Sequence, residues 1–257
     1  MKRIIFIVVL FNCLQAATAE EGPLVAVAAN MMHVMNGIQE AYLEEGNNSI
    51  NFVYSSSGNL ARQILQGAPF ELFLSANRVY VDFLIQNDIR IAGIKEFARG
   101  RIGYFIPKNS SLSNKTGLEE INKTLVNGEY HRIAIANPEF APYGVAAEQA
   151  LRTAGLWVIE SDKLLLGENT AQAVQFSLSG GVDIGIIPSS YAVIRAVRDG
   201  GKFYLIPEEW HQPIIEYLVL LLRSGPEGKK FYNYLQSDKV RLILEKNGYT
   251  ANTGPDD

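Results

Sequence analysis

The order of strand-like and helix-like segments constrains the fold of this 257-residue chain more than any other feature. Between residues 24 and 87, three apolar runs alternate with three segments in which apolar residues recur at helical spacing. An order of β-α-β-α-β-α within so short a stretch favours a parallel sheet with helices on its faces. The strand-like runs are LVAVAA (24–29), INFVYS (50–55) and FELFLSA (70–76), and the helices follow at 31–46, near 60–67 and at 77–87.

A second series of the same kind follows after residue 100. It predicts strands at 101–107, 132–136, 182–188 and 202–207, and helices at 143–155, 170–181 and 189–201. The polar region 108–128 is interpreted as a surface excursion. The run IIEYLVLLLRSG (214–225) is predicted to be a buried strand, although Glu216 and Tyr217 interrupt its apolar residues, and 229–249 is predicted to form two helices.

Two series of strands and helices predict two α/β lobes. Extended segments near 98–103 and 208–214 would then cross between them. We expect residues 20–100 and 213–257 to form the first lobe and residues 101–212 the second. Each lobe would hold about half of the chain, which suits a hinged pair.

The N-terminus has the pattern of a cleavable export signal. Basic residues 2–3 precede the apolar run IIFIVVLF (4–11), and the small residues ATA (17–19) supply a cleavage site, so residues 1–19 are predicted to be a signal peptide. The apolar run is far shorter than the ~20 residues of a membrane span. Lipid attachment at Cys13, the only cysteine, is an alternative.

The formal net charge of −4 argues against nucleic acid or an anionic membrane surface as a partner. It does not exclude an anionic ligand, because the backbone dipoles at a helix N-terminus bind anions without any net positive charge.

Polar or turn-forming residues follow four of the predicted strands, at the points where helices begin. They are Asn30, the sequence SSSG at 55–58, Ala141-Pro142-Tyr143, and Asn169-Thr170. Ligands bind at the carboxyl ends of parallel strands, and helix N-termini there expose N–H donors. The alternative is that these residues are ordinary helix N-caps. No Lys or Arg stands in the four junctions, so a ligand there would be held without salt bridges.

Within SSSG, we expect Ser57 to donate through its hydroxyl and its backbone N–H, and Gly58 to let the chain approach the ligand. Ser55 and Ser56 are interpreted as strand-end and turn residues.

The sequence has none of the common signatures of catalysis. Its three histidines lack metal-binding spacing, and no nucleophile elbow, phosphate-binding loop or dinucleotide fingerprint is present. The pair Met31-Met32 could suggest copper, but beside an apolar helix face these residues are interpreted as core. We therefore predict a binding protein that is not an enzyme, with an exported enzyme as the alternative.

Several of these segments, in this order, resemble a known family. The stretches VAVAANMM, SSSGNLARQILQGAPFELFLSA, ANPEFAPYGVAAEQAL and GENTAQAVQFSLSGGVDIGII are similar to those of periplasmic molybdate-binding proteins, the soluble receptors of molybdate ABC transporters. The resemblance begins near Val25 and continues to the C-terminal helices.

This resemblance implies a periplasmic-binding-protein fold of type II, with mainly parallel sheets flanked by helices and a ligand cleft between the lobes. It implies that molybdate or tungstate is held by uncharged groups, without direct protein–metal ligands and without a cofactor. Carried over by motif, the oxyanion-binding residues are Ala29, Asn30, Ser57, Gly58, Tyr143 and Thr170.

The resemblance also implies a periplasmic, monomeric protein that serves a membrane permease and an ATPase. The chain departs from the family at Asn30, where many members have serine, and at Pro188, where many have tyrosine. Because these departures touch the choice of anion, sulfate, thiosulfate or a small carboxylate remain alternative ligands, for transport or for sensing.

Overall fold

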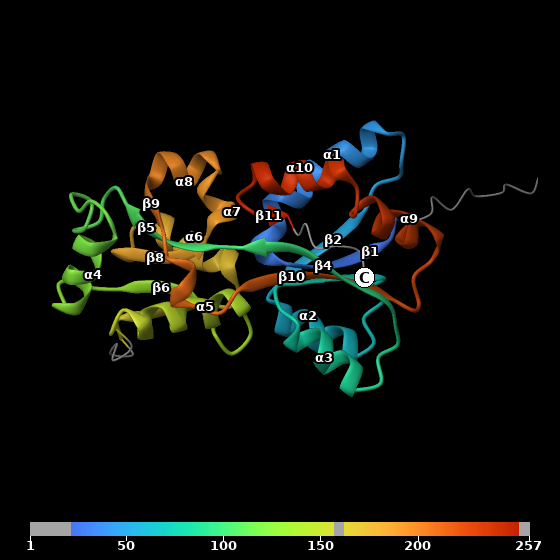
Figure 1. The fold of residues 1–257 in the computed structure, drawn as a ribbon, viewed down its shortest axis with the longest axis horizontal. Coiled ribbons are helices and arrows are strands. Elements are labelled where there is room, and N and C mark those ends of the chain that lie inside the picture. The colour runs from blue at the N-terminus through green and yellow to red at the C-terminus, as the bar shows by residue number, and fades with distance from the viewer. Residues whose placement is uncertain (1–21, 157–161, 252–257) are drawn as a thin grey trace, which may run out of the picture.

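The computed structural model describes residues 22–156 and 162–251, which form two sheets lying side by side (Figure 1). Each sheet carries its own set of helices. The first sheet has six strands, in the order β11 (Thr250–Ala251), β4 (Ile91–Gly100), β10 (Ile214–Leu221), β3 (Leu72–Ser75), β1 (Leu24–Ala28) and β2 (Asn51–Ser55). The second has five, in the order β7 (Leu164–Gly167), β6 (Ile133–Ala136), β8 (Ile184–Pro188), β5 (Ile102–Pro107) and β9 (Gly201–Leu205).

Helices cover both faces of the first sheet. One face carries α1 (Met32–Glu44), which continues the short helix η1 (Ala29–Met31), together with α9 (Pro226–Tyr234) and α10 (Asp238–Lys246) (Figure 1). The other face carries α2 (Ser57–Leu65) and α3 (Val79–Gln86). The apolar positions of α1 recur at helical spacing, so Val34, Ile38 and Tyr42 are all buried against the sheet.

The second sheet is covered by a second set of helices. They are α4 (Leu118–Val126), α5 (Pro142–Thr153), α6 (Thr170–Leu178), α7 (Ser189–Ala192) and α8 (Arg195–Gly200), and η2 (Glu208–Trp210) follows in the connection to β10. The largest core cluster of this half includes Ile102, Tyr104 and Ile135 from the sheet and Ala147 and Leu151 from α5.

The two sheets are mixed, whereas mainly parallel sheets were expected. Strands β1, β2 and β3 are parallel, as are β6, β7 and β8. The antiparallel pairs involve the strands that connect the two halves, because β4 leads directly into β5 and β9 leads into β10. A chain that leaves one sheet and later returns must enter it in the opposite direction. The predicted α/β class and the two lobes are confirmed.

Some local predictions were wrong. Region 108–128 contains α4, whose Ile121, Thr124 and Leu125 are buried, although the surrounding sequence is polar. The predicted helix at 189–201 is two short helices, α7 and α8. Along the described residues, no helix is both long and apolar enough to cross a membrane. The predicted signal peptide lies outside the described residues, and the exact lobe boundaries stay a prediction.

Candidate anion-binding site

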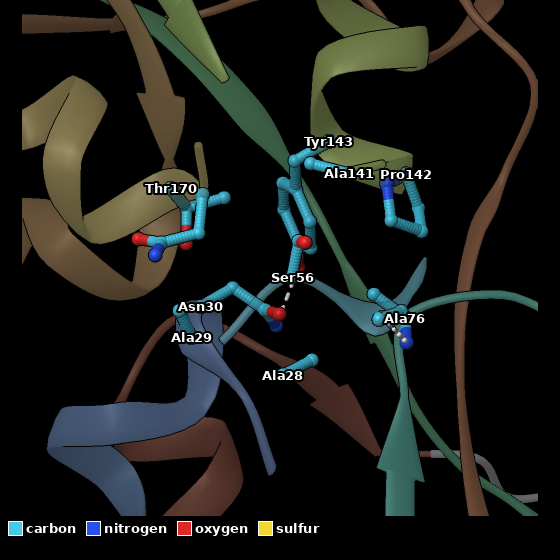
Figure 2. Close-up of a pocket in the computed structure, with 11 residues that line it drawn as sticks. Ala28, Ala29, Asn30, Ser56, Ala76, Ala141, Pro142, Tyr143 and Thr170 are labelled. Carbon is cyan, nitrogen blue, oxygen red and sulfur yellow. Dashed lines mark hydrogen bonds between the residues drawn. The ribbon is translucent and has the colours of Figure 1, made fainter. Parts of the chain in front are cut away.

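A small pocket lies between the two halves, and segments from both sheets line it (Figure 2). Its cavity volume is about 10 Å³, far below the roughly 300–1,000 Å³ of pockets that hold drug-sized ligands. A pocket of this size suits a compact ligand. Its lining residues are Ala28, Ala29, Asn30, Ser56, Ser57, Ala76, Ala141, Pro142, Tyr143, Asn169 and Thr170.

Four helical segments begin at this pocket: η1 with α1, α2, α5 and α6. Each presents first-turn N–H groups that have no partner within the helix, and each carries a partial positive charge there. Only one of the four has a side-chain cap, in which Asn169 accepts a hydrogen bond from the backbone N–H of Gln172. The cap residues Ala28, Ser56 and Ala141 make no such bond. The helix-cap interpretation therefore accounts for Asn169 but not for the serines.

Ser56 and Ser57 form one wall of the pocket, and each has a hydroxyl proton available for a ligand. Ser57 Oγ accepts a hydrogen bond of 3.0 Å from the backbone N–H of Ala76, so its own proton remains free to donate. Ser56 Oγ is buried and has no hydrogen-bond partner among the described residues. A buried, unpaired hydroxyl costs free energy unless a ligand or water pairs with it. Both serines are thus placed to bind an acceptor.

The opposite wall combines a free hydroxyl with hydroxyls that hold the backbone. Thr170 Oγ1 is buried and makes no hydrogen bond to the described residues. Burial raises the pKa of the neighbouring Tyr191, and the Thr170 hydroxyl opposes this shift in part. The Tyr191 hydroxyl donates to the carbonyl oxygen of Ala29 at 2.7 Å, and Ser190 Oγ donates to that of Asn30 at 2.8 Å. The carbonyl oxygens of the 29–30 loop are therefore already paired with donors.

The side chain of Asn30 is held in a buried network behind the pocket. Its Nδ2 donates to Glu216 Oε1 at 2.7 Å and to the Tyr249 hydroxyl at 2.9 Å. The Tyr143 hydroxyl donates to the same Glu216 oxygen at 2.9 Å, and it lies 3.3 Å from Asn30 Nδ2 (Figure 2 shows the Asn30–Tyr143 contact). Since an amide nitrogen has two protons, Asn30 has none left for a ligand, and it can donate to one only through its backbone N–H.

Burial keeps this network neutral. Glu216 is fully buried, and desolvation raises its pKa to about 8, although the hydrogen bonds from Tyr143 and Asn30 oppose this shift. The pKa values of Tyr143 and Tyr249 lie well above their ordinary range, mainly because both hydroxyls are buried and secondly because Glu216 is close. At neutral pH no member of the network therefore carries a charge that would oppose an anion.

The two halves touch each other around the pocket. The backbone N–H of Gly58 donates to the carbonyl oxygen of Phe140 at 3.0 Å, and the Tyr80 hydroxyl donates to that of Glu139 at 3.2 Å. A Cβ on Gly58 would lie 3.0 Å from the Phe140 oxygen and 2.9 Å from the Tyr80 ring. Glycine at this position thus allows the two halves to meet. Gly58 is absent from the pocket lining, unlike the other five predicted site residues.

Within the part of the chain that the structure describes, no charged side chain lines the pocket. Among residues 22–156 and 162–251, no group of three or more His, Cys, Asp or Glu side chains could hold a metal ion. Neutral N–H and O–H donors at helix N-termini can hold an anion, because each hydrogen bond to a charged acceptor contributes about 1.5–3 kcal/mol. Donors of this kind can hold a small anion through its outer atoms.

Sequence reasoning missed several residues of this site. Ser56 was interpreted as a turn residue but lines the pocket, and Ser190, Tyr191 and Tyr249 were not considered. One feature of the sequence could have indicated the network behind the pocket: Glu216 interrupts the apolar run 214–225. A glutamate is rarely buried without a specific partner.

Two α/β halves joined by crossing strands, with a closed pocket of neutral donors between them, define a protein that encloses a small solute. The chain belongs to the family of bacterial extracellular solute-binding proteins, whose sequence profile matches residues 23–250.

Individual relatives refine this assignment. The chain is 30% identical to the molybdate-binding protein ModA of Escherichia coli, over 91% of each chain. Its fold is similar to that of the periplasmic molybdate-binding protein of Azotobacter vinelandii, with a TM-score of 0.80 at 22% identity, covering 90% of this chain and 100% of the other. The sulfate-binding protein SubI of Mycobacterium tuberculosis shares the fold at a TM-score of 0.71 and 14% identity, covering 91% and 87%. These matches confirm the resemblance to molybdate-binding proteins.

Proposed function

We propose that this protein captures molybdate, and also tungstate, in the pocket between its lobes and delivers it to a membrane transporter. The observation that carries the proposal is the set of neutral donors at the pocket: the free hydroxyls of Ser56, Ser57 and Thr170 beside four helix N-termini. The similarity to molybdate-binding proteins over nearly the whole chain supports the choice of anion.

The binding residues we propose are Ala29 and Asn30 through their backbone N–H groups, Ser57 and Thr170 through hydroxyl and backbone, and Tyr143 through its backbone N–H. Ser56 joins this set as a hydroxyl donor. Gly58 contributes indirectly, because its contact with Phe140 holds the lobes together over the ligand. No step of covalent chemistry is involved, and we propose no enzymatic activity and no cofactor.

The donor set also predicts selectivity. The backbone N–H groups at the four helix starts can only donate, so the proton that hydrogen phosphate carries could pair only with a hydroxyl oxygen. All four oxygens of an unprotonated dianion can accept. Sulfate carries the same charge as molybdate, so only the size of the closed pocket separates the two. Sulfate is the second candidate ligand, because the sulfate-binding protein SubI has the same fold.

We propose that residues 1–19 direct export and are then cleaved, which leaves the mature protein in the periplasm. There the monomeric protein would present its closed form to the permease and ATPase of an ABC transporter. Opening of the lobes would occur at the segments near residue 101 and between β9 and β10, where the chain passes from one sheet to the other.

Thermal unfolding with a panel of oxyanions tests the proposal. A ligand that binds only the native state raises the unfolding free energy by about 2.7 kcal/mol at a hundredfold excess over its Kd. Molybdate and tungstate should raise the melting temperature, whereas sulfate, thiosulfate and phosphate should have little effect at the same concentration. A shift with sulfate but not with molybdate would reassign the ligand, and no shift with any anion would reject an oxyanion receptor.

A further inference from the structure

Glu216 places a buried carboxylic acid directly behind the pocket. The donors that line the pocket do not explain why it is there. It lies on β10, one of the strands that connect the halves, and none of its surface is exposed. Burying a carboxyl group is unfavourable, so a side chain kept there needs a specific function or a specific set of partners.

Glu216 touches one pocket residue from each lobe. Its Oε1 accepts hydrogen bonds from Asn30, which lies in the helical segment after β1, and from Tyr143, which lies in the first turn of α5. The two partners are 113 residues apart in sequence and belong to different halves of the molecule. The carboxyl oxygen lies on a strand of the first sheet, so Asn30 reaches it from the same half and Tyr143 from the other half. Its hydrogen bond with Tyr143 therefore links the two halves.

We propose that Glu216 is the positioning residue of the closed anion site: as a neutral acid, it fixes Asn30 and Tyr143 together and thereby couples lobe closure to anion binding. This inference rests on the proposed function. Because both hydrogen bonds go to Oε1, the proton resides on Oε2, which makes no hydrogen bond with the described residues. A deprotonated Glu216 would place a negative charge one side chain away from the bound dianion.

Among the described residues, the groups around Glu216 supply no charge that would compensate. Asn30 faces it from η1, Tyr143 from α5, and Tyr249 from the segment between α10 and β11, with Ser190 of α7 beyond them. On the neighbouring strand β4, the residue paired with Glu216 is Ala98. The titratable members of this set are tyrosines, whose pKa values are raised by burial, so Glu216 is the first of the group to ionise as pH rises.

The coupling has a consequence for pH. Since the pKa of Glu216 is raised to about 8, the acid is neutral below that pH and ionises above it. Anion affinity should therefore be at its full value at neutral pH and fall at higher pH. The repulsion between a dianion and a nearby buried charge reduces affinity by on the order of tenfold or more.

Calorimetric titration with sodium molybdate tests the inference in four proteins: the wild type, Glu216→Gln, Glu216→Ala and the control Glu168→Gln. Glu168 has an exposed side chain beside the pocket residues Asn169 and Thr170, so its variant removes a nearby charge without touching the network. Titrations at about pH 6.5 and about pH 9.5 bracket the ionisation of Glu216, and molybdate remains a dianion throughout this range.

The wild type and Glu168→Gln should both bind roughly tenfold more weakly at the higher pH. Glu216→Gln keeps a neutral acceptor, so it should bind with the same affinity at both. Glu216→Ala should bind roughly tenfold more weakly than Glu216→Gln at either pH, because Asn30 and Tyr143 lose their shared acceptor.

A fall in affinity that persists in Glu216→Gln, or wild-type binding by a folded Glu216→Ala, would overturn the inference. Failure of the wild type to bind molybdate at neutral pH is a different result, which rejects the proposed ligand. The same comparison of pH values then proceeds with whichever oxyanion raises the melting temperature.

Discussion

The two sides of the pocket use polar groups in opposite ways. On the serine wall (Ser56 and Ser57), hydroxyls are buried with protons available: Ser56 has no partner among the described residues, and Ser57 only accepts. Behind the other side, the side chains of Asn30, Tyr143 and Glu216 are bonded to one another. We refer to this second group as the tied wall.

The difference separates binding from positioning. Free donors cost stability in the empty protein and recover that cost only when an acceptor arrives, so they favour the liganded state. Groups already bonded to each other gain little from a ligand, but they fix the geometry in which the free donors and backbone N–H groups point inward. Substitutions in the serine wall should therefore change affinity, whereas substitutions in the tied wall should change both affinity and folding.

The largest effect we expect concerns the stability of Glu216→Gln. The folded-state pKa of Glu216 is raised to about 8 from an ordinary value of 4.5, so between these two values the native protein keeps a proton that the unfolded chain releases. The unfolding free energy of the wild type therefore falls as pH rises through this window, by up to ~1.4 kcal/mol per pH unit.

Glutamine has no proton to lose, so the stability of Glu216→Gln relative to the wild type should rise by ~3 kcal/mol between about pH 5 and about pH 8 and then level off. Urea unfolding of both proteins at a series of pH values measures this difference. A difference that does not vary with pH would mean that Glu216 titrates in its ordinary range, and that the tied wall is charged at neutral pH.

The second prediction concerns Gly100→Ala on β4, which should disrupt the tied wall by displacing the side chain of Tyr143. A Cβ on Gly100 would lie 1.8 Å from the Tyr143 hydroxyl oxygen and 2.8 Å from its ring, so the Tyr143 side chain must leave Glu216. Gly100→Ala should reduce molybdate affinity by about a hundredfold, equivalent to about 2.7 kcal/mol, as measured by calorimetric titration.

Gly93→Ala is the matched control for this change. Gly93 lies on the same strand, and its Cβ would lie 2.8 Å from the hydroxyl of Tyr232, a residue that does not line the pocket. Gly93→Ala should lower the melting temperature without a comparable loss of affinity. Equal losses of affinity in the two variants would show that damage to β4, and not displacement of Tyr143, is responsible.

Much of the fold could be predicted because local patterns determine it. Runs such as LVAVAA and helices with apolar residues at Val34, Ile38 and Tyr42 carry their own periodicity, and these elements have the predicted type. Helix α4 was missed because only Ile121, Thr124 and Leu125 of its nine residues are buried, too few to stand out in a polar segment.

The site divides in the same way. The predicted pocket residues follow strands directly, so their position in the chain indicates which edge of the sheet they occupy. The tied wall depends on contacts between distant parts of the chain: Asn30 meets Glu216 across 186 residues and Tyr249 across 219. No local pattern encodes such pairs. Gly58 illustrates the same limit, because its neighbour Phe140 comes from the other half of the molecule.

The third prediction tests the serine wall at Ser57. Ser57→Ala removes one donor to the ligand and also the acceptor of the Ala76 N–H, so the loss of affinity should be about tenfold to a hundredfold. Ser55→Ala is the control, because Ser55 lies at the end of β2 and outside the pocket lining. If calorimetry finds equal affinities for Ser57→Ala and Ser55→Ala, Ser57 does not contact the anion.

The smallest effect, and the sharpest distinction between the two walls, concerns Ser56. Because its hydroxyl is buried without a partner among the described residues, Ser56→Ala removes an unpaired polar group from the empty protein and one donor from the liganded protein. Affinity for molybdate should fall by up to about tenfold, while the melting temperature without ligand stays the same or rises.

Glu216→Ala should instead lower both quantities, since it leaves Asn30 and Tyr143 without their acceptor. A melting temperature of unliganded Ser56→Ala that falls as far as that of Glu216→Ala would show that Ser56 is a structural residue, and the contrast between free and tied walls would then be confined to Ser57.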